Sequence, residues 1–194
     1  MIELPDDPGP NGLEYALIDY GTVQRGASSL RVDRPGSRFL LGVSYPPMQP
    51  DTARKFVARL QRAKSEGIRL KLPLLGVSQG VPGSPVVNGA GQSGKVLNIR
   101  GLTAAYAFKE GFWLTITGAD GTSYLHSVSE PAVSTAGGLA TVEIEPMLRE
   151  AFADGAVIEL GAPFIEGFID GDSWSWTVPV NRLIAVAFSV EEYR

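Results

Sequence analysis

The sequence predicts a mainly-β protein. We expect a β-sandwich built from the two ends of the chain, one flanking α-helix, and a small β-barrel inserted between the two ends. Short segments with alternating apolar and polar residues recur along the chain, as is typical of strands with one buried face. The 23 glycines and 14 prolines divide the chain into such short segments. Only residues 51–65 have the apolar spacing of a helix.

The composition sets limits on the kind of protein. The chain has 194 residues, enough to bury a core without disulfides or metals. Its net charge of -4 is unlike that of strongly basic nucleic-acid binders. With no cysteine and a single histidine, His126, neither a thiolate zinc site nor a polyhistidine site is expected. We predict no metal and no cofactor.

The N-terminal residues show neither a signal peptide nor a membrane anchor. They lack a basic segment followed by an apolar one, and no apolar run approaches the roughly 20 residues that span a bilayer. We therefore expect synthesis in the cytoplasm and no membrane insertion. Residues 1–12, rich in Pro, Asp and Gly, are expected to form an ordered arm or a frayed end.

The first half of the predicted sandwich begins with three strands, at 13–17, 28–33 and 38–45. Alternation in the third strand places four apolar side chains on one face: Phe39, Leu41, Val43 and Tyr45. Pro46 and Pro47 are expected to end this strand because proline cannot donate a hydrogen bond to a neighbouring strand.

The helix is predicted over 51–65, with Asp51 as N-cap and Gly67 at its C-terminal end. A strand at 68–72 follows. The apolar stripe of the helix consists of Ala53, Phe56, Val57, Leu60 and Ala63. Its opposite face is basic and consists of Arg54, Lys55, Arg59, Arg62 and Lys64.

The inserted barrel is predicted over residues 76–161, and the sandwich over 1–75 plus 162–194. Asp120 and Gly121 mark a tight hairpin between two barrel strands. The five barrel strands are expected at 96–99, 112–117, 124–128, 139–144 and 156–160. The chain returns to the sandwich with strands at 164–169, 174–178 and 184–191.

One stretch resembles a nucleotide-binding loop. Gly89, Gly91 and Gly94 give G-x-G-x-x-G, and with Lys95 the stretch gives most of G-x-x-x-x-G-K. A phosphate-binding loop needs a helix after it and a Ser or Thr after the lysine. Val96 occupies that position and begins a β-branched run, so the stretch is predicted to be a turn between strands at the entrance of the barrel.

A second stretch resembles the nucleophile elbow of hydrolases, with Ser78 in a G-x-S-x-G pattern. Pro82 and Gly83 exclude the helix that should follow. Ser78, Asp120 and His126 have the chain order of a catalytic triad, although His126 is expected within a short strand. A small hydrolase is therefore kept as an alternative whose discriminator is the geometry of these three residues.

Two pairs of carboxylates and two tryptophans complete the candidates. Glu143 with Glu145 and Asp170 with Asp172 have the spacing of glycosidase pairs, but solvated strand edges and turns also show it. Trp174 and Trp176 are predicted on one strand face, either as buried anchors of the sandwich or as an exposed sugar-binding row, listed here as Trp174 and Trp176. No catalytic residue is predicted, and a carbohydrate- or receptor-binding β-module is a second alternative.

The order of segments resembles one protein family. The run Phe-Leu-Leu-Gly-Val-Ser-Tyr-Pro-Pro at 39–47 is followed by the helix and by a corner at 70–73. Val-Asn-Gly-Ala-Gly-Gln-Ser-Gly follows at 87–94, and Gly-Leu-Ala-Thr-Val-Glu-Ile-Glu-Pro-Met-Leu-Arg at 138–149. From about residue 38 to its end, the chain resembles distal tail proteins, the tail-tip (baseplate) proteins of long-tailed siphophages.

This resemblance implies a non-enzymatic virion protein of the tail tip, with a tail-tube-like β-sandwich. Such proteins form rings, usually homohexamers, that join the tail tube to the baseplate hub. The ring leaves a channel for the tape-measure protein and for the passage of DNA. The helix and its flanking strands would then form the contact between subunits, through Tyr45, Arg54, Arg59 and Arg62.

Overall fold

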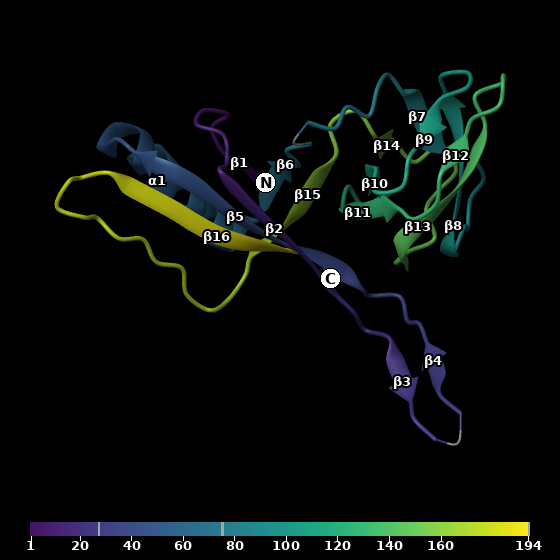
Figure 1. The fold of residues 1–194 in the computed structure, drawn as a ribbon, viewed down its shortest axis with the longest axis horizontal. Helices are drawn as coiled ribbons and strands as arrows, with labels where there is room; N and C mark the ends of the chain where they lie inside the picture. The colour runs from purple at the N-terminus through teal and green to yellow at the C-terminus, as the bar shows by residue number, and fades with distance from the viewer. Residues whose placement is uncertain (27, 75, 194) are drawn as a thin grey trace. The chain divides into compact units, whose positions relative to one another are not determined.

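The structure is a computed structural model that describes residues 1–26, 28–74 and 76–193. Strands hold 45% of the residues and helix 9%, so the predicted mainly-β class with a single flanking helix and an inserted barrel is confirmed. Among the described residues the helix is α1 (Pro50–Glu66) (Figure 1). Contacts along the chain divide it into two compact units, and each is described by itself.

The first unit comprises residues 1–17, 39–73 and 165–193, and the second comprises 18–38 and 74–164. The division expected from the sequence placed 18–38 with the sandwich, whereas the contacts of these residues group them with the barrel. The expected boundary at residue 75 lies outside the described residues.

The first unit is built on one six-stranded sheet with the order β1-β6-β15-β16-β5-β2. Strands from both ends of the chain alternate in it, because β15 and β16 lie between β6 and β5. The pairs β15–β16 and β16–β5 are antiparallel, and β1 runs parallel to β6. The strands are β1 (Ile2–Glu3), β2 (Gly12–Ile18), β5 (Arg38–Met48), β6 (Ile68–Lys71), β15 (Phe164–Ile169) and β16 (Ile184–Glu192).

The two long central strands confirm the predicted apolar faces. All four side chains predicted to share a face of β5 are buried, as are Ile184, Val186, Phe188 and Val190 on β16. The prediction that β5 ends before Pro46 is wrong, since the strand continues through both prolines to Met48. The pairing of β16 with β5 shifts register at this point, so the prolines lie in an irregularity where no ladder donor is needed.

Helix α1 covers the sheet with its predicted stripe. Ala53, Phe56, Leu60 and Ala63 are buried, and the ring of Phe56 meets that of Tyr45 edge to face at 4.8 Å. The N-cap is Gln49 instead of the predicted Asp51, because Pro50 occupies the first helical position and moves Asp51 into the first turn. Gly67 ends the helix with a φ of 77° and donates to the carbonyl of Ala63, as predicted.

The second unit contains a nearly closed barrel of six strands in the order β14-β10-β11-β13-β8-β7. A β-bridge between Val86 and Val157 joins the first strand to the last, and Val87 donates to the carbonyl of Ala156 at 2.9 Å. A two-stranded ribbon, β9 with β12, accompanies it. The strands are β7 (Gly83–Val87), β8 (Gly94–Leu102), β9 (Ala107–Phe108), β10 (Trp113–Thr117), β11 (Ser123–Val128), β12 (Ala132–Val133), β13 (Ala140–Leu148) and β14 (Ile158–Glu159).

The barrel differs from the prediction at its two ends. The predicted loop before residue 94 contains β7, whose Pro85 lies where the pairing with β8 shifts register, so it removes no regular ladder bond. The last predicted strand is reduced to β14. The hairpin at Asp120 is confirmed, since β10 and β11 pair on either side of it and Asp120 accepts from the backbone of Thr122 at 2.9 Å.

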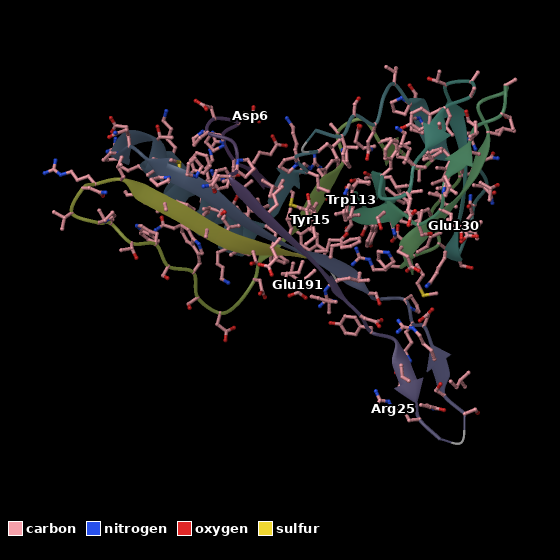
Figure 2. All side chains as sticks on the ribbon, in the orientation of Figure 1. Asp6, Tyr15, Arg25, Trp113, Glu130 and Glu191 are labelled. Carbon is pink, nitrogen blue, oxygen red and sulfur yellow. The ribbon has the colours of Figure 1, made fainter. Side chains whose placement is uncertain are left out.

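Two further segments differ from the prediction. The strand expected at 28–33 is the shorter β4 (Leu30–Val32), which forms a hairpin with β3 (Thr22–Gln24); Arg25 follows β3 near the hairpin end (Figure 2). The strand predicted at 174–178 is absent among the described residues, where 170–183 form a long loop between β15 and β16 (Figure 1). Pro179 limits strand pairing there, and the indole of Trp174 donates to the carbonyl of Ala187 at 2.8 Å.

Candidate functional site

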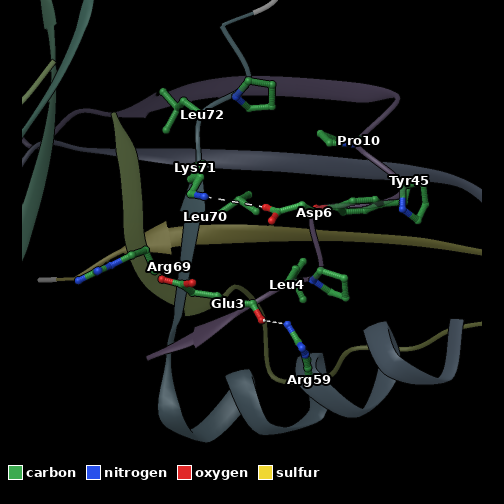
Figure 3. Close-up of a pocket in the computed structure, with 13 residues that line it drawn as sticks. Glu3, Leu4, Asp6, Pro10, Tyr45, Arg59, Arg69, Leu70, Lys71 and Leu72 are labelled. Atoms are coloured by element: carbon green, nitrogen blue, oxygen red, sulfur yellow. Dashed lines mark hydrogen bonds and ion pairs between the residues drawn. The ribbon is translucent and has the colours of Figure 1, made fainter. Parts of the chain in front are cut away.

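The most developed cavity of the first unit lies under its N-terminal arm. Residues 3–10 cross over β6 and enclose a space of about 460 Å³, which we call the arm pocket (Figure 3). This volume falls within the range of roughly 300–1,000 Å³ typical of ligand sites. Its walls come from the arm, from the end of β6, from α1 and from β5 through the side chains of Glu3, Leu4, Pro5, Asp6, Pro8, Pro10, Tyr45, Arg59, Arg69, Leu70, Lys71, Leu72 and Pro73.

The arm is held by a short parallel pairing. Ile2 is paired with Ile68, is 8% exposed, and donates its backbone N–H to Gly67 at 3.0 Å. Only Ile2 and Glu3 belong to β1, and Pro5 cannot continue the ladder because it has no N–H. The chain therefore leaves β6 at this point, and the space beneath it becomes the pocket.

Three cations reach the pocket, and the structure neutralises them unequally. Arg69 pairs with the carboxylate of Glu166 at 2.5 Å, and Glu166 is 1% exposed, so Arg69 has a structural task. The ammonium of Lys71 lies 3.9 Å from the carboxylate of Asp6, and both side chains are largely exposed. Arg59 donates to the backbone carbonyl of Glu3 at 2.7 Å, as Figure 3 shows.

The apolar wall of the pocket is rigid. Leu70 and Leu72 are buried, and Tyr45 is 4% exposed between the rings of Phe56 and Phe188. Burial raises the pKa of the Tyr45 phenol to about 12, so this wall carries no negative charge at neutral pH. The pocket thus combines apolar side chains with two cations, Arg59 and Lys71, that are only partly compensated.

The structure brings together two of the four residues predicted at a subunit contact. Tyr45 and Arg59 both line the arm pocket. Arg54 and Arg62 instead lie exposed on α1, where Arg54 pairs with Asp51 at 2.7 Å and Arg62 with Glu66 at 2.9 Å. These exposed pairs within one helix satisfy both guanidinium groups locally.

Sequence reasoning missed the remaining cations of the pocket. Alternation in residues 68–72 does place Arg69 and Lys71 on one face of a strand. It gives no indication that an arm 60 residues earlier in the chain crosses that strand. A parallel pairing of two residues leaves too short a pattern to be recognised in a sequence.

The glycine-rich stretch is a hairpin loop between β7 and β8, as predicted. The backbone N–H of Gly89 donates to the carboxylate of Asp154 at 2.8 Å, so an anion of the protein itself occupies the place of a phosphate. Lys95 pairs with Glu145 at 2.5 Å and with Asp33 at 3.4 Å. The hydrogen bond from Glu145 is the main cause that raises the pKa of Lys95.

The three residues of the candidate triad are engaged separately. The imidazole of His126 is fully buried, its Nδ1 donates to the carbonyl of Pro146 at 2.8 Å, and burial lowers its pKa to about 4. Ser78 is exposed and its hydroxyl accepts from the backbone of Gly80. Asp120 is bound by the backbone and the hydroxyl of Thr122, so the arrangement does not support proton transfer from Ser78 to His126.

The G-x-S-x-G pattern has a structural explanation in the residue beside the serine. Gln79 is 4% exposed, and its amide donates to the carbonyls of Trp113 and Leu160. Its carbonyl oxygen accepts from the backbone of Trp113 at 2.7 Å. This glutamine anchors the loop that enters the barrel.

The carboxylate pairs do not form a cleft with a common occupant. Glu143 is exposed on β13, whereas Glu145 is bound to Lys95. Asp170 and Asp172 are exposed in the loop after β15. Within the described ranges, no three His, Cys, Asp or Glu side chains gather in a way that would hold a metal ion.

The tryptophans are not the buried anchors that one reading of the sequence favoured. Their rings stack on each other with centroids 5.2 Å apart, and Trp176 is 39% exposed. Trp174 is half-buried and fixed by its bond to Ala187. This exposed pair keeps the sugar-binding alternative open.

Comparisons with known proteins give no family assignment. No protein-family model matches the chain, and a search of the curated proteins finds no significant match. Among the described residues, no helix is long and apolar enough to cross a membrane.

Proposed function

We propose that the protein is a structural component of a phage tail tip, a ring-forming adaptor that joins the tail tube to the baseplate hub. In this proposal the first unit forms the ring, probably excluded from any enzymatic role, and the barrel is carried by it as an inserted domain. Its partners are further copies of itself, six in the ring, together with the tail-tube, hub and tape-measure proteins. DNA meets the protein only by passing through the channel.

The observation that supports this proposal best is the edge of the first sheet. Strand β2 is an edge strand, and two of its outward side chains are apolar and exposed, Tyr15 at 40% and Leu17 at 48% (Figure 2). An exposed apolar edge is a site where another chain adds to a sheet, and proteins that remain monomeric usually protect such edges. A ring of identical subunits covers this edge in every copy.

The test is assembly with the neighbouring proteins of the tail. The purified chain is mixed with the tail-tube and hub proteins of the same phage and examined by size-exclusion chromatography and negative-stain electron microscopy. We expect rings with an open centre that bind the end of the tube. A chain that joins neither protein and forms no ring would contradict the proposal.

A carbohydrate-binding module is a second candidate, favoured by the exposed stack of Trp174 and Trp176. Aromatic faces exposed in this way bind the apolar faces of sugars. Glycan-array binding that is lost in Trp176→Ala, and retained in Trp113→Phe in the other unit, would support it. An array without any binding would remove this candidate.

A further inference from the structure

The tip of the loop between β15 and β16 exposes apolar side chains on an ordered turn. Val178 is 61% exposed and Val180 is 102% exposed. The turn is closed by a hydrogen bond of 2.9 Å from the backbone of Arg182 to the carbonyl of Pro179, and Arg182 has a φ of 60°. These features define a β-turn with Val180 at its second position, where a polar residue would serve the turn equally well.

The exposed apolar residues of this loop follow a regular spacing. Trp176, Val178 and Val180 lie two residues apart, the spacing that places side chains on one side of an extended segment. We call residues 176–180 the loop tip. Three neighbouring apolar side chains at the surface form a feature that calls for a partner.

The base of the same loop is acidic. Asp170 and Asp172 are exposed, and neither carboxylate forms an ion pair with a cation in the part of the chain that the structure describes. Lys64 approaches this region, but its ammonium donates to the backbone carbonyls of Ile169 and Gly171. The loop therefore presents an apolar tip together with negative charge.

The arm pocket has the complementary character. Its floor and walls are apolar, with Leu70 and Leu72 from β6 and four prolines around them. Its rim carries Arg59 and Lys71, which the structure compensates only with a backbone carbonyl and with a carboxylate 3.9 Å away. A segment with apolar side chains and nearby carboxylates matches both properties.

We propose that the loop tip of one copy inserts into the arm pocket of a second copy. Val178 and Val180 occupy the space under the arm, and Asp170 and Asp172 face the cations on its rim. This inference rests on the proposed function, for which it names the contact between neighbouring subunits. Each copy carries one tip and one pocket, so the contact is head-to-tail, and such contacts generate a ring where the rotation between copies closes.

The first test changes the loop tip alone. Val178→Asp/Val180→Asp places charge on two exposed positions, where the fold is expected to tolerate it. We expect the dissociation constant for self-association, measured by analytical ultracentrifugation, to rise by at least about tenfold. The matched control is Val81→Asp, because Val81 is 79% exposed but lies in the second unit.

The second test locates the partner of the tip. The chain has no cysteine, so Val180→Cys and Lys71→Cys proteins carry one thiol each. In an equal mixture under mild oxidation, we expect the disulfide between the two variants to exceed both homodimers. Adding Val178→Asp to the Val180→Cys protein should reduce it to the level of the homodimers.

The outcomes separate this inference from the function on which it rests. If wild type associates but the tip variant associates equally well, or if the mixed disulfide does not exceed the homodimers, the docking inference is overturned and the ring proposal stands. If wild type stays monomeric alone and with its tail partners, both are overturned. Weakened association in the tip variant only, together with an enriched mixed disulfide, supports the inference.

Discussion

The glycine-rich hairpin of the second unit and the arm pocket of the first unit both place cations beside backbone groups, but in opposite states of compensation. In the hairpin, Lys95 has two carboxylate partners and Gly89 binds Asp154. In the pocket, Arg59 has a backbone carbonyl and Lys71 a distant carboxylate. The segment that resembles a binding motif is therefore closed, and the segment without a motif is open.

This difference shows what determines the capacity of a loop to bind an anion. A spacing of glycines and a lysine describes which conformations the backbone can reach. Whether a ligand is bound depends on whether the donors and charges are already satisfied within the fold. The predictions below test this difference, beginning with the largest expected effect.

Arg69 separates structural from available cations within the pocket. Removing it in Arg69→Ala leaves the carboxylate of Glu166 buried without its guanidinium, and we expect a loss of about 3 kcal/mol in the free energy of unfolding. Urea denaturation measures it. Arg59→Ala serves as the control and should change stability by less than about 0.5 kcal/mol, because its side chain is exposed. Equal effects of the two variants would contradict the assignment.

Acid should destabilise the second unit through its buried histidine. The pKa of His126 is lowered to about 4 in the folded protein, against an ordinary value of 6.5, so the unfolded chain binds more protons between these values. Its contribution is complete above pH 6.5 and is lost as the pH falls to about 4, by roughly 3 kcal/mol.

The measurement is the pH dependence of unfolding in Trp174→Phe/Trp176→Phe, in which Trp113 alone reports on the second unit. His126→Leu in the same background should flatten the slope between pH 6.5 and 4, whatever its effect on absolute stability. A slope that is unchanged by His126→Leu would show that other groups cause the acid sensitivity.

The two lysines should differ in their contribution to stability. Lys95→Ala removes a cation with two carboxylate partners and should cost about 1 kcal/mol in thermal or chemical denaturation. Lys71→Ala removes a largely exposed cation with one distant partner and should cost less than about 0.3 kcal/mol. If Lys71 proves the more important for stability, the pocket is as closed as the hairpin.

The smallest expected effect is that of nucleotides. Millimolar ATP with magnesium, or NAD, should leave the melting temperature unchanged, because the donors of the hairpin are bound within the protein. A thermal shift that disappears in Lys95→Ala would overturn this reading of the glycine-rich stretch.

Much of the fold could be predicted because its elements have strong local patterns. The buried faces of β5 and β16 follow an alternation over several residues, and α1 shows a complete apolar stripe with Gly67 at its end. The exclusion of a helix after Lys95 also rested on local chemistry. The long loop at 170–183 was missed because Trp174 and Trp176 alternate like strand residues but bind outside a ladder.

The candidate site was harder to predict because it depends on long-range contacts. Tyr45 and Arg59 were selected for the strand and helix that carry them, and only the tertiary fold shows that they share a pocket. The contribution of the arm depends on the two residues of β1. No periodicity in two residues specifies which strand they join.

The central claim is that this chain assembles into a ring of identical subunits, and native mass spectrometry at micromolar concentration tests it most directly. The account predicts one closed species of defined subunit number, a hexamer, formed alone or on addition of the tail-tube and hub proteins. A single species with the mass of the 194-residue monomer under all of these conditions would contradict it.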